Sequence, residues 1–291
     1  NYKLVEAYAS GLGRTESEVI SFLISPDIIS GLGPLIPSIP KIQLGCSSFF
    51  YQNENQNLSH LRILDFPLGE DYNRNERAIK YRFKGEQSYF GISTAGFPFP
   101  SITAMNESGL TFALHQKFGH IFNREGQPIF DIMENLVSKC ESISDIKMRL
   151  GDTESISSWG IYVSSSKERQ VLAIDLLGDK YSKKQYDLES EDIHYFNNKF
   201  INQNIETRHI QPLNFQKYCD EREQDAQLKI KAIKSRQDKS ILKKISTVSP
   251  LSDRSTVITS SSILACVMNP SEEKIIFNAD ESPKYFRSQI N

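Results

Sequence analysis

Hydrophobic residues recur with a helical period in the middle of the chain and again near its end. Over residues 128–150 the apolar side chains fall at i, i+3, i+4, i+7, i+8 and i+11. They are Ile129, Ile132, Met133, Leu136, Val137 and Cys140. A second, weaker helix is expected near 142–150. Residues 212–245 predict a heavily charged helix with sparse apolar anchors, most of whose surface faces solvent.

The first part of the chain predicts helix followed by loop. Residues 1–25 have helical character, with a break at the Gly11-Leu12-Gly13 segment. Thr15 and Glu18 form a capping box ahead of the next apolar residues. Residues 26–45 contain four prolines and three glycines, so they are predicted to be a loop.

Short apolar runs bounded by polar or turn residues predict strands in the rest of the chain. These runs are residues 46–51, 61–66, 78–83, 89–94, 102–106, 110–116, 159–164, 171–176, 193–196, 262–268 and 274–278. The polar segment 52–57 joins the first two runs and indicates a hairpin. Groups of strands alternate with groups of helices, which predicts helices layered on antiparallel sheets rather than alternating parallel units.

Composition narrows the possible partners. The chain has 291 residues, of which 38% are hydrophobic and 24% are charged, as in ordinary globular proteins. Its 34 Lys and Arg against 36 Asp and Glu give a net charge of −2, which argues against nucleic acid as a partner. No apolar run reaches the roughly 18 residues of a membrane-spanning helix. No signal peptide is visible, which favours a cytoplasmic location, although residue 1 is Asn rather than Met.

The cysteines and histidines do not follow a ligand pattern. Cys46, Cys140, Cys219 and Cys266 include no C-x-x-C pair, and the five histidines include no H-x-x-x-H spacing. The chain also has no P-loop and no convincing dinucleotide-binding motif. We therefore expect no metal and no cofactor, and we interpret all the cysteines except Cys46 as small buried apolar side chains.

The Gly45-Cys46 junction is the sharpest local feature. A proline-rich segment delivers this dipeptide to the start of a predicted strand. The second strand of the hairpin carries Arg62 and Asp65, so both return beside the start of the first. Because these two residues are separated by an odd number of positions, their side chains point to opposite faces unless the strand end bends.

This junction with its spaced Arg62 and Asp65 resembles the N-terminal-nucleophile hydrolases of the choloylglycine hydrolase and isopenicillin N acyltransferase type. Further blocks similar to the family pattern lie at residues 96, 105–110, 114–116, 197–200 and 267–270. The sequence departs from the family at Ile63, where an Asn is usual. It departs again at 114–116, where the family often has Asn or Tyr.

The resemblance implies an α+β fold, the four-layer αββα sandwich, and a chain in two parts. Residues 1–45 would be a pro-segment and residues 46–291 a single catalytic domain. The Cys46 thiol would attack the Gly45 carbonyl, take the acyl group from nitrogen to sulfur, and release it to water. The new terminal residue would then carry nucleophile and base together.

The resemblance also assigns roles around Cys46. Asp65 would accept a hydrogen bond from the Cys46 amine and orient it. Arg62 would favour the thiolate and hold the carboxylate in place. An ordinary cross-strand ion pair between Arg62 and Asp65 stays open as the plain alternative.

Four further residues complete the predicted site. Asn198 would offer its side-chain NH₂ to the developing oxyanion, with a backbone N–H near His115 or Gln116 as the second donor. Arg222 is the nearest candidate for an arginine that recurs in the family's late helical region. Asn198 stays open to the plain role of a turn residue. The side chain of His115 is interpreted as part of the core or of a pocket wall.

We therefore predict an autoprocessing cysteine amidase or acyltransferase that acts on a non-peptide C–N amide of a small molecule, through an acyl-enzyme on Cys46. A catalytically silent member of the same fold that binds a ligand or partner is the alternative, for which the change at Ile63 leaves room. A papain-like protease ranks last, because it needs its cysteine at the start of a helix. A homo-oligomer is compatible with the sequence.

Overall fold

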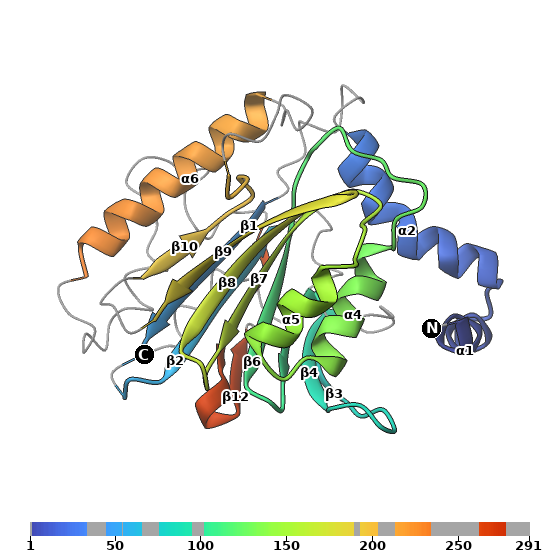
Figure 1. Cartoon of the computed structure of the whole chain (residues 1–291), viewed down its shortest axis with the longest axis horizontal. Helices are drawn as coiled ribbons and strands as arrows, with labels where there is room; N and C mark the ends of the chain where they lie inside the picture. Colours follow the sequence, from blue (N-terminus) through green and yellow to red (C-terminus); the bar gives the residue numbers. More distant parts are fainter. Residues whose placement is uncertain are drawn as a thin grey trace.

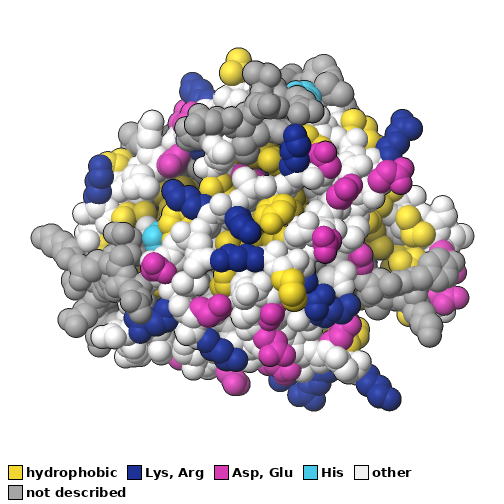
Figure 2. Space-filling model, in the orientation of Figure 1, with side chains coloured by type: hydrophobic (Ala, Val, Ile, Leu, Met, Phe, Trp, Pro, Cys, Tyr) yellow, Lys and Arg dark blue, Asp and Glu magenta, His cyan; other side chains and the backbone are white. Residues whose placement is uncertain are grey.

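Two antiparallel sheets lie face to face at the centre of the molecule, and helices cover both outer faces (Figure 1). The computed structural model describes residues 2–33, 45–53, 55–65, 76–94, 102–188, 193–202, 213–233 and 262–277. This arrangement confirms the predicted αββα sandwich. On the face shown in Figure 2, basic and acidic side chains are interspersed, in line with the nearly balanced charge.

The smaller sheet carries the predicted hairpin at its centre. Its strands, in spatial order, are β10 (His194–Phe196), β1 (Gly45–Gln52), β2 (Leu58–Asp65), β11 (Ser262–Asn269) and β12 (Lys274–Phe277). In the hairpin, Gly45 pairs with Asp65 and Cys46 pairs with Leu64. The start of β1 therefore lies directly beside the end of β2.

The larger sheet has seven strands in sequence order. They are β3 (Glu76–Tyr81), β4 (Tyr89–Thr94), β5 (Thr103–Asn106), β6 (Leu110–Gln116), β7 (Ser158–Ser165), β8 (Gln170–Leu177) and β9 (Lys180–Asp187). The sequence did not predict β9, whose residues are mostly polar and exposed. It lies at the edge of the sheet and pairs with β8 along its whole length. Pairing rather than burial therefore makes this segment a strand.

Alternate side chains of β1 are divided between two apolar layers. Phe49 and Tyr51 pack toward helix α6 (Leu213–Lys231), which covers the smaller sheet. Phe50 points the other way and packs with residues of the larger sheet, including Tyr162. All eight residues of β1 are buried, because the strand is covered on both faces. The charged helix predicted over 212–245 ends at Lys231, and residues 234–245 lie outside the described residues.

The other four helices in the described part of the chain belong to the layer on the larger sheet. They are α1 (Tyr2–Leu12), α2 (Glu16–Leu32), α4 (Ile129–Lys139) and α5 (Ile143–Leu150), and they share one apolar cluster with β4 to β8. The periodic residues predicted from 128–150 are all buried in it, and the capping box at Thr15 is formed. In the part of the chain that the structure describes, no helix is both long and apolar enough to cross a membrane.

Helix α2 corrects the predicted loop over residues 26–45, because it continues through Pro26 to Leu32. A proline inside a helix leaves the carbonyl four residues earlier without its N–H partner. Here that carbonyl belongs to Phe22, and the Ser25 hydroxyl donates to it at 2.7 Å. The loss is thus compensated locally. Residues 34–44 of the predicted loop lie outside the described residues.

Candidate active site

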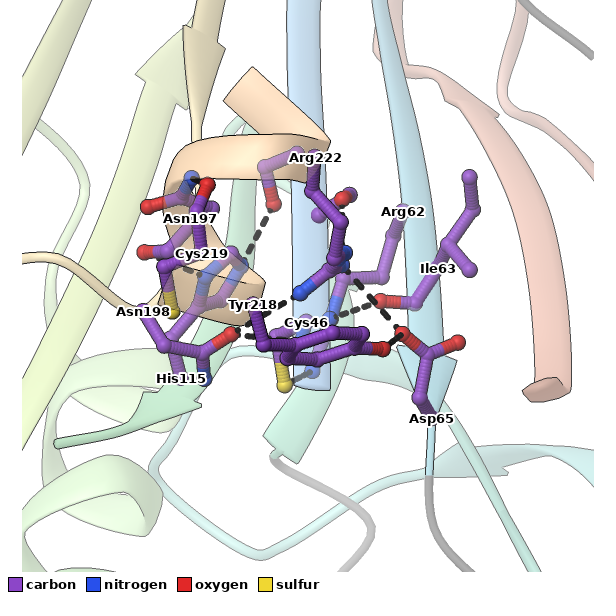
Figure 3. A network of polar contacts seen from close by, with 12 residues as sticks. Cys46, Arg62, Ile63, Asp65, His115, Asn197, Asn198, Tyr218, Cys219 and Arg222 are labelled. Atoms are coloured by element: carbon purple, nitrogen blue, oxygen red, sulfur yellow. Dashed lines mark hydrogen bonds and ion pairs between the residues drawn. The ribbon is translucent and has the colours of Figure 1, made fainter. Parts of the chain in front are cut away.

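Cys46 is the second residue of β1, and its side chain points between the two sheets (Figure 3). Its sulfur lies 3.2 Å from Nη2 of Arg62 and 3.8 Å from the carbonyl oxygen of Leu114. The side chain is 4% exposed. The sulfur is thus buried and in direct contact with the positively charged guanidinium of Arg62.

The guanidinium of Arg62 is fixed by backbone carbonyls. Nη2 donates to the oxygen of Leu114 at 2.7 Å, and Nη1 donates to the oxygen of Ile63. The Ile63 side chain lies on the opposite face, in the apolar layer beneath α6. The departure from the family pattern at this position therefore falls on the side of the sheet away from the sulfur. The family's Asn is replaced by a core residue whose carbonyl holds Arg62.

Asp65 lies on the α6 side of β2, where it pairs with a residue of that helix. Its Oδ2 is 3.2 Å from Nη2 of Arg222, and both side chains are fully buried. Arg62 and Asp65 thus face opposite sides of the sheet, as their odd spacing predicts. Arg222 also donates to the Ser47 hydroxyl at 2.6 Å. The structure therefore brings the distant Arg222 to the start of β1.

Gly45 is enclosed by this ion pair and by Tyr218. A Cβ atom on Gly45 would lie 2.7 Å from Nη1 of Arg222, 2.7 Å from Oδ2 of Asp65 and 3.1 Å from the Tyr218 ring. The Tyr218 hydroxyl donates to Oδ2 of Asp65 at 3.4 Å, and the centre of its ring is 5.1 Å from the Arg222 guanidinium. Only a glycine fits at this position without displacing its neighbours.

Asn198 holds the backbone nitrogen of Cys46. Its Oδ1 accepts from that N–H at 2.8 Å and from Nη1 of Arg222 at 3.3 Å. Its Nδ2 donates to the carbonyl of Gln116 at 2.9 Å. Because Oδ1 faces two donors and Nδ2 faces an acceptor, the orientation of this amide is determined. In the uncut chain its oxygen faces the Cys46 nitrogen, and the oxyanion role of its NH₂ stays a prediction.

His115 is buried beside the site but has other partners. Its Nε2 lies 2.9 Å from the Ser48 hydroxyl, and its Nδ1 lies 3.2 Å from the carbonyl of Asn197. Burial, assisted by the charge of Arg62, lowers the pKa of His115 well below its usual value, so the ring is neutral. These contacts agree with the predicted core role of its side chain. The role of a nearby backbone N–H stays a prediction.

Several residues of the site were not predicted from the sequence. Tyr218 precedes Arg222 by one helical turn, so this spacing was a usable signal once Arg222 was in view. Ser47 and Asn197 stand next to predicted residues, and Asn197 belongs to the block 197–200, but neither was assigned a role. The other cysteines, Cys140, Cys219 and Cys266, are buried as predicted. Within the described residues, no group of three or more His, Cys, Asp or Glu side chains is placed to hold a metal ion.

Comparison with known proteins supports the fold. No protein-family model matches the sequence, and no curated protein matches it. Among solved structures, the fold is similar to that of a Caenorhabditis elegans N-acylethanolamine-hydrolyzing acid amidase ortholog. The TM-score is 0.56 at 16% sequence identity, over 83% of this chain and 97% of that one. The likeness extends over nearly the whole amidase and supports the four-layer αββα sandwich for this chain.

Proposed function

We propose that the protein is an autoprocessing cysteine amidase or acyltransferase. It would cut its own Gly45–Cys46 bond and then act on a non-peptide C–N amide, such as an N-acyl amine or N-acyl amino acid. One observation carries the proposal: the sulfur and the backbone nitrogen of Cys46 are both held, by Arg62 at 3.2 Å and by Asn198 at 2.8 Å. The fold it shares with an N-acylethanolamine-hydrolyzing amidase supports the same class of bond.

The self-cleavage step uses the groups around Gly45. The Cys46 sulfur attacks the Gly45 carbonyl carbon, so that a C–S bond forms and the C–N bond breaks. The nitrogen of Cys46 takes up a proton and becomes an amine, and water then hydrolyses the thioester, leaving a carboxylate on Gly45. The enclosure of Gly45 by Asp65, Arg222 and Tyr218 supports this step, because it restricts the carbonyl to few positions next to the sulfur.

Turnover repeats the same chemistry on an external amide. The free amine of Cys46 takes the thiol proton, the sulfur attacks the substrate carbonyl, and the proton passes to the departing amine. Water or an acceptor amine then resolves the acyl-enzyme. Asn198 is bonded to the Cys46 nitrogen before cleavage. It is thus suited to orient the amine after cleavage. Arg222 links Asn198 to Asp65, because it donates to the Asn198 oxygen and pairs with the Asp65 carboxylate.

Mass spectrometry of the purified protein tests the proposal. Wild-type protein should yield one fragment ending at Gly45 and one beginning at Cys46, whereas Cys46→Ala should stay a single chain. Cys140→Ala, which removes a buried thiol from the apolar cluster between the larger sheet and its helices, should cleave like the wild type. A wild type that stays intact yet hydrolyses amides would contradict the self-cleavage mechanism.

The alternative, a catalytically silent member of the same fold, makes a different prediction. A thiol-reactive amide analogue should label Cys46 of the processed protein if the enzyme is active. Failure of the probe to label a correctly processed Cys46 would favour a ligand- or partner-binding role. To distinguish hydrolysis from acyl transfer, the protein is incubated with an N-acyl amine in the presence and absence of a second amine, and the products are compared.

A further inference from the structure

A chain of buried hydrogen-bonding side chains connects the two sheets, and the proposed chemistry does not use it. His115 Nε2 lies 2.9 Å from the Ser48 hydroxyl, which lies 3.1 Å from Nε2 of His60. His60 Nδ1 lies 2.8 Å from the Thr111 hydroxyl, which lies 2.5 Å from the hydroxyl of Ser164. All five side chains are fully buried. Buried polar groups at such a density need a reason beyond packing.

The direction of every hydrogen bond in this chain follows from its last contact. His115 Nδ1 faces the carbonyl oxygen of Asn197 at 3.2 Å, and a carbonyl only accepts, so Nδ1 carries the proton. Burial lowers the pKa of both histidines well below the usual value, so each ring is neutral. His115 Nε2 therefore accepts from Ser48, and the Ser48 oxygen in turn accepts from Nε2–H of His60.

The two histidines must consequently hold opposite tautomers. His60 carries its proton on Nε2, because it donates to Ser48. Its Nδ1 then accepts from the Thr111 hydroxyl, which accepts from Ser164. The chain runs in a single direction from Ser164 to the carbonyl of Asn197.

A second buried chain ends on the same carbonyl. Lys117 and Asp175 form an ion pair at 3.2 Å with no exposed side-chain surface, and Lys117 Nζ donates to the Tyr162 hydroxyl at 2.9 Å. A lysine only donates, so the Tyr162 O–H is left to donate to the oxygen of Asn197, at 3.2 Å. The rings of His115 and Tyr162 pack edge to face, with centroids 4.4 Å apart.

The residues after Asn198 are anchored by the same ion pair. Lys117 Nζ donates to the carbonyl of Lys199, and the backbone N–H of Ile201 donates to Asp175 at 2.6 Å. On the other side, Nδ2 of Asn197 donates to the carbonyl of Cys219 at 2.9 Å. The backbone is therefore fixed both before and after Asn198.

We propose that His115 and Tyr162 are positioning residues, which lock the Asn197 carbonyl with two donors and so hold the Asn198 amide against the Cys46 nitrogen. The expected effect of these residues on the rate of self-cleavage rests on the proposed function, whereas the geometry of their hydrogen bonds does not. Neither side chain contacts the reacting atoms in this structure. Each acts through the peptide that joins Asn197 to Asn198.

Nitrogen NMR of protein labelled at histidine tests the geometry without any activity. The chain has five histidines, so the spectrum is simple. His115 should show a protonated Nδ1 and His60 a protonated Nε2, both unchanged between pH 5.5 and pH 8. If His115 has its proton on Nε2, or if the two rings share one tautomer, the proposal is wrong.

Variants test the positioning. The side-chain N–H of an asparagine can occupy the place of Nδ1, whereas that of a glutamine reaches only the place of Nε2. We expect His115→Gln and Tyr162→Phe each to speed hydrogen exchange of the Asn198 side-chain NH₂ by roughly tenfold, the loss of one ordinary hydrogen bond. His115→Asn, and the control Tyr186→Phe in the neighbouring aromatic cluster, should change it by less than about threefold.

The rate of self-cleavage provides the second readout. It should fall about tenfold in His115→Gln and Tyr162→Phe and recover largely in His115→Asn, if Asn198 acts as proposed. Equal exchange rates in the Asn and Gln variants of His115 would mean a space-filling role and overturn the positioning. A wild type that never cleaves, with the expected tautomers and exchange rates, would count against the proposed function alone.

Discussion

The Arg222 guanidinium and the Asp65 carboxylate form a fully buried ion pair, 3.2 Å apart, directly beside Gly45. The pair joins α6 to the end of β2 and so closes the α6 side of the predicted cleavage site. Because both charges lie out of water, removing one leaves the other uncompensated. The pair is thus the point where the stability of the fold and the chemistry of the junction depend on the same atoms.

Asp65→Asn should lower the free energy of unfolding by about 3–5 kcal/mol, the usual effect of breaking a buried pair. The double variant Asp65→Asn with Arg222→Met should lose less than the sum of the single variants, because it leaves no unpaired charge. Chemical denaturation of the four proteins measures this coupling. Arg14→Met, which removes an exposed pair with Glu18, should change stability by less than about 1 kcal/mol. Additive losses in the double variant would contradict the pairing.

Gly45→Ala should slow self-cleavage strongly, because the new methyl group would collide with Arg222 and Asp65 at 2.7 Å. Relieving the collision requires both charged groups to move, with an expected loss of about 1–3 kcal/mol in stability. Time courses of cleavage followed by mass spectrometry provide the measurement. Gly11→Ala in α1 is the matched control: nothing lies within 4 Å of its added Cβ, and it should gain a few tenths to about 1 kcal/mol. Cleavage of Gly45→Ala at the wild-type rate would refute the steric argument.

Arg62→Met should slow alkylation of Cys46 by iodoacetamide at pH 7 by about tenfold, because it removes the guanidinium 3.2 Å from the sulfur, and reactive cysteines lie beside such positive charges. Arg62→Lys keeps the charge and should slow alkylation less. Peptide mapping separates the four cysteines, and Cys266, which is fully buried, reports opening of the fold in the same sample. Unchanged alkylation of Cys46 relative to Cys266 would argue against electrostatic activation by Arg62.

Glu134 predicts a pH dependence of stability that is independent of the site. Burial raises its pKa to about 7, from 4.5, and both carboxylate oxygens accept from the Tyr89 hydroxyl at 2.8 Å. The folded state therefore binds the proton more tightly than the unfolded state. This contribution to stability is complete below about pH 4.5 and is lost as the pH rises to about 7.

Glu134→Gln should abolish that part of the pH dependence. Relative to the wild type it should gain up to about 3 kcal/mol in free energy of unfolding between pH 4.5 and pH 7.5. Denaturation curves at a series of pH values measure the difference. Glu141→Gln, at an exposed position, is the control and should run parallel to the wild type. Parallel curves for Glu134→Gln and the wild type would show that folding does not shift the pKa of this carboxyl.

The sequence predicted those elements whose side chains alternate between core and solvent or between two cores. Ile129, Met133 and Val137 show a helical period because one face of α4 is buried. Strand β9 has no such pattern, since it is an exposed edge held by pairing with β8. Helix α2 was predicted too short, because the hydroxyl that compensates for Pro26 is not visible from proline content.

The residues of the site also differ in how far the sequence predicted them. Cys46, Arg62 and Asp65 belong to a single hairpin, so their spacing along the chain was enough to bring them together. Asn198 and Arg222 come from distant segments and were identified only through the resemblance to a family. The hydrogen-bond chains that meet at Asn197 depend on how two sheets stack, and local sequence carries no signal for that.

Asp27 anchors α2, within the predicted pro-segment, to the rest of the molecule. Its fully buried carboxylate accepts from the backbone N–H of Ile129, the Ser157 hydroxyl and the indole N–H of Trp159, at 2.7–3.0 Å. All three partners are donors, so Asp27→Asn turns one oxygen into an NH₂ group that opposes a donor. We expect a loss of about 2–3 kcal/mol in stability.

If the Gly45–Cys46 bond is cut, the same contacts decide whether the fragments stay together. Residues 1–45 of the wild type should co-elute with residues 46–291 in size-exclusion chromatography, whereas Asp27→Asn should release the shorter fragment at low protein concentration. Asp152→Asn, at an exposed turn, should behave like the wild type. The Ser30 hydroxyl, also in α2, lies 2.6 Å from the carbonyl oxygen of Lys117 and 2.8 Å from that of Ser158 and can donate its one proton to either, so its replacement by Ala should weaken retention in the same direction. Retention of the fragment in both variants would mean that the apolar surface of the two helices is sufficient to hold it.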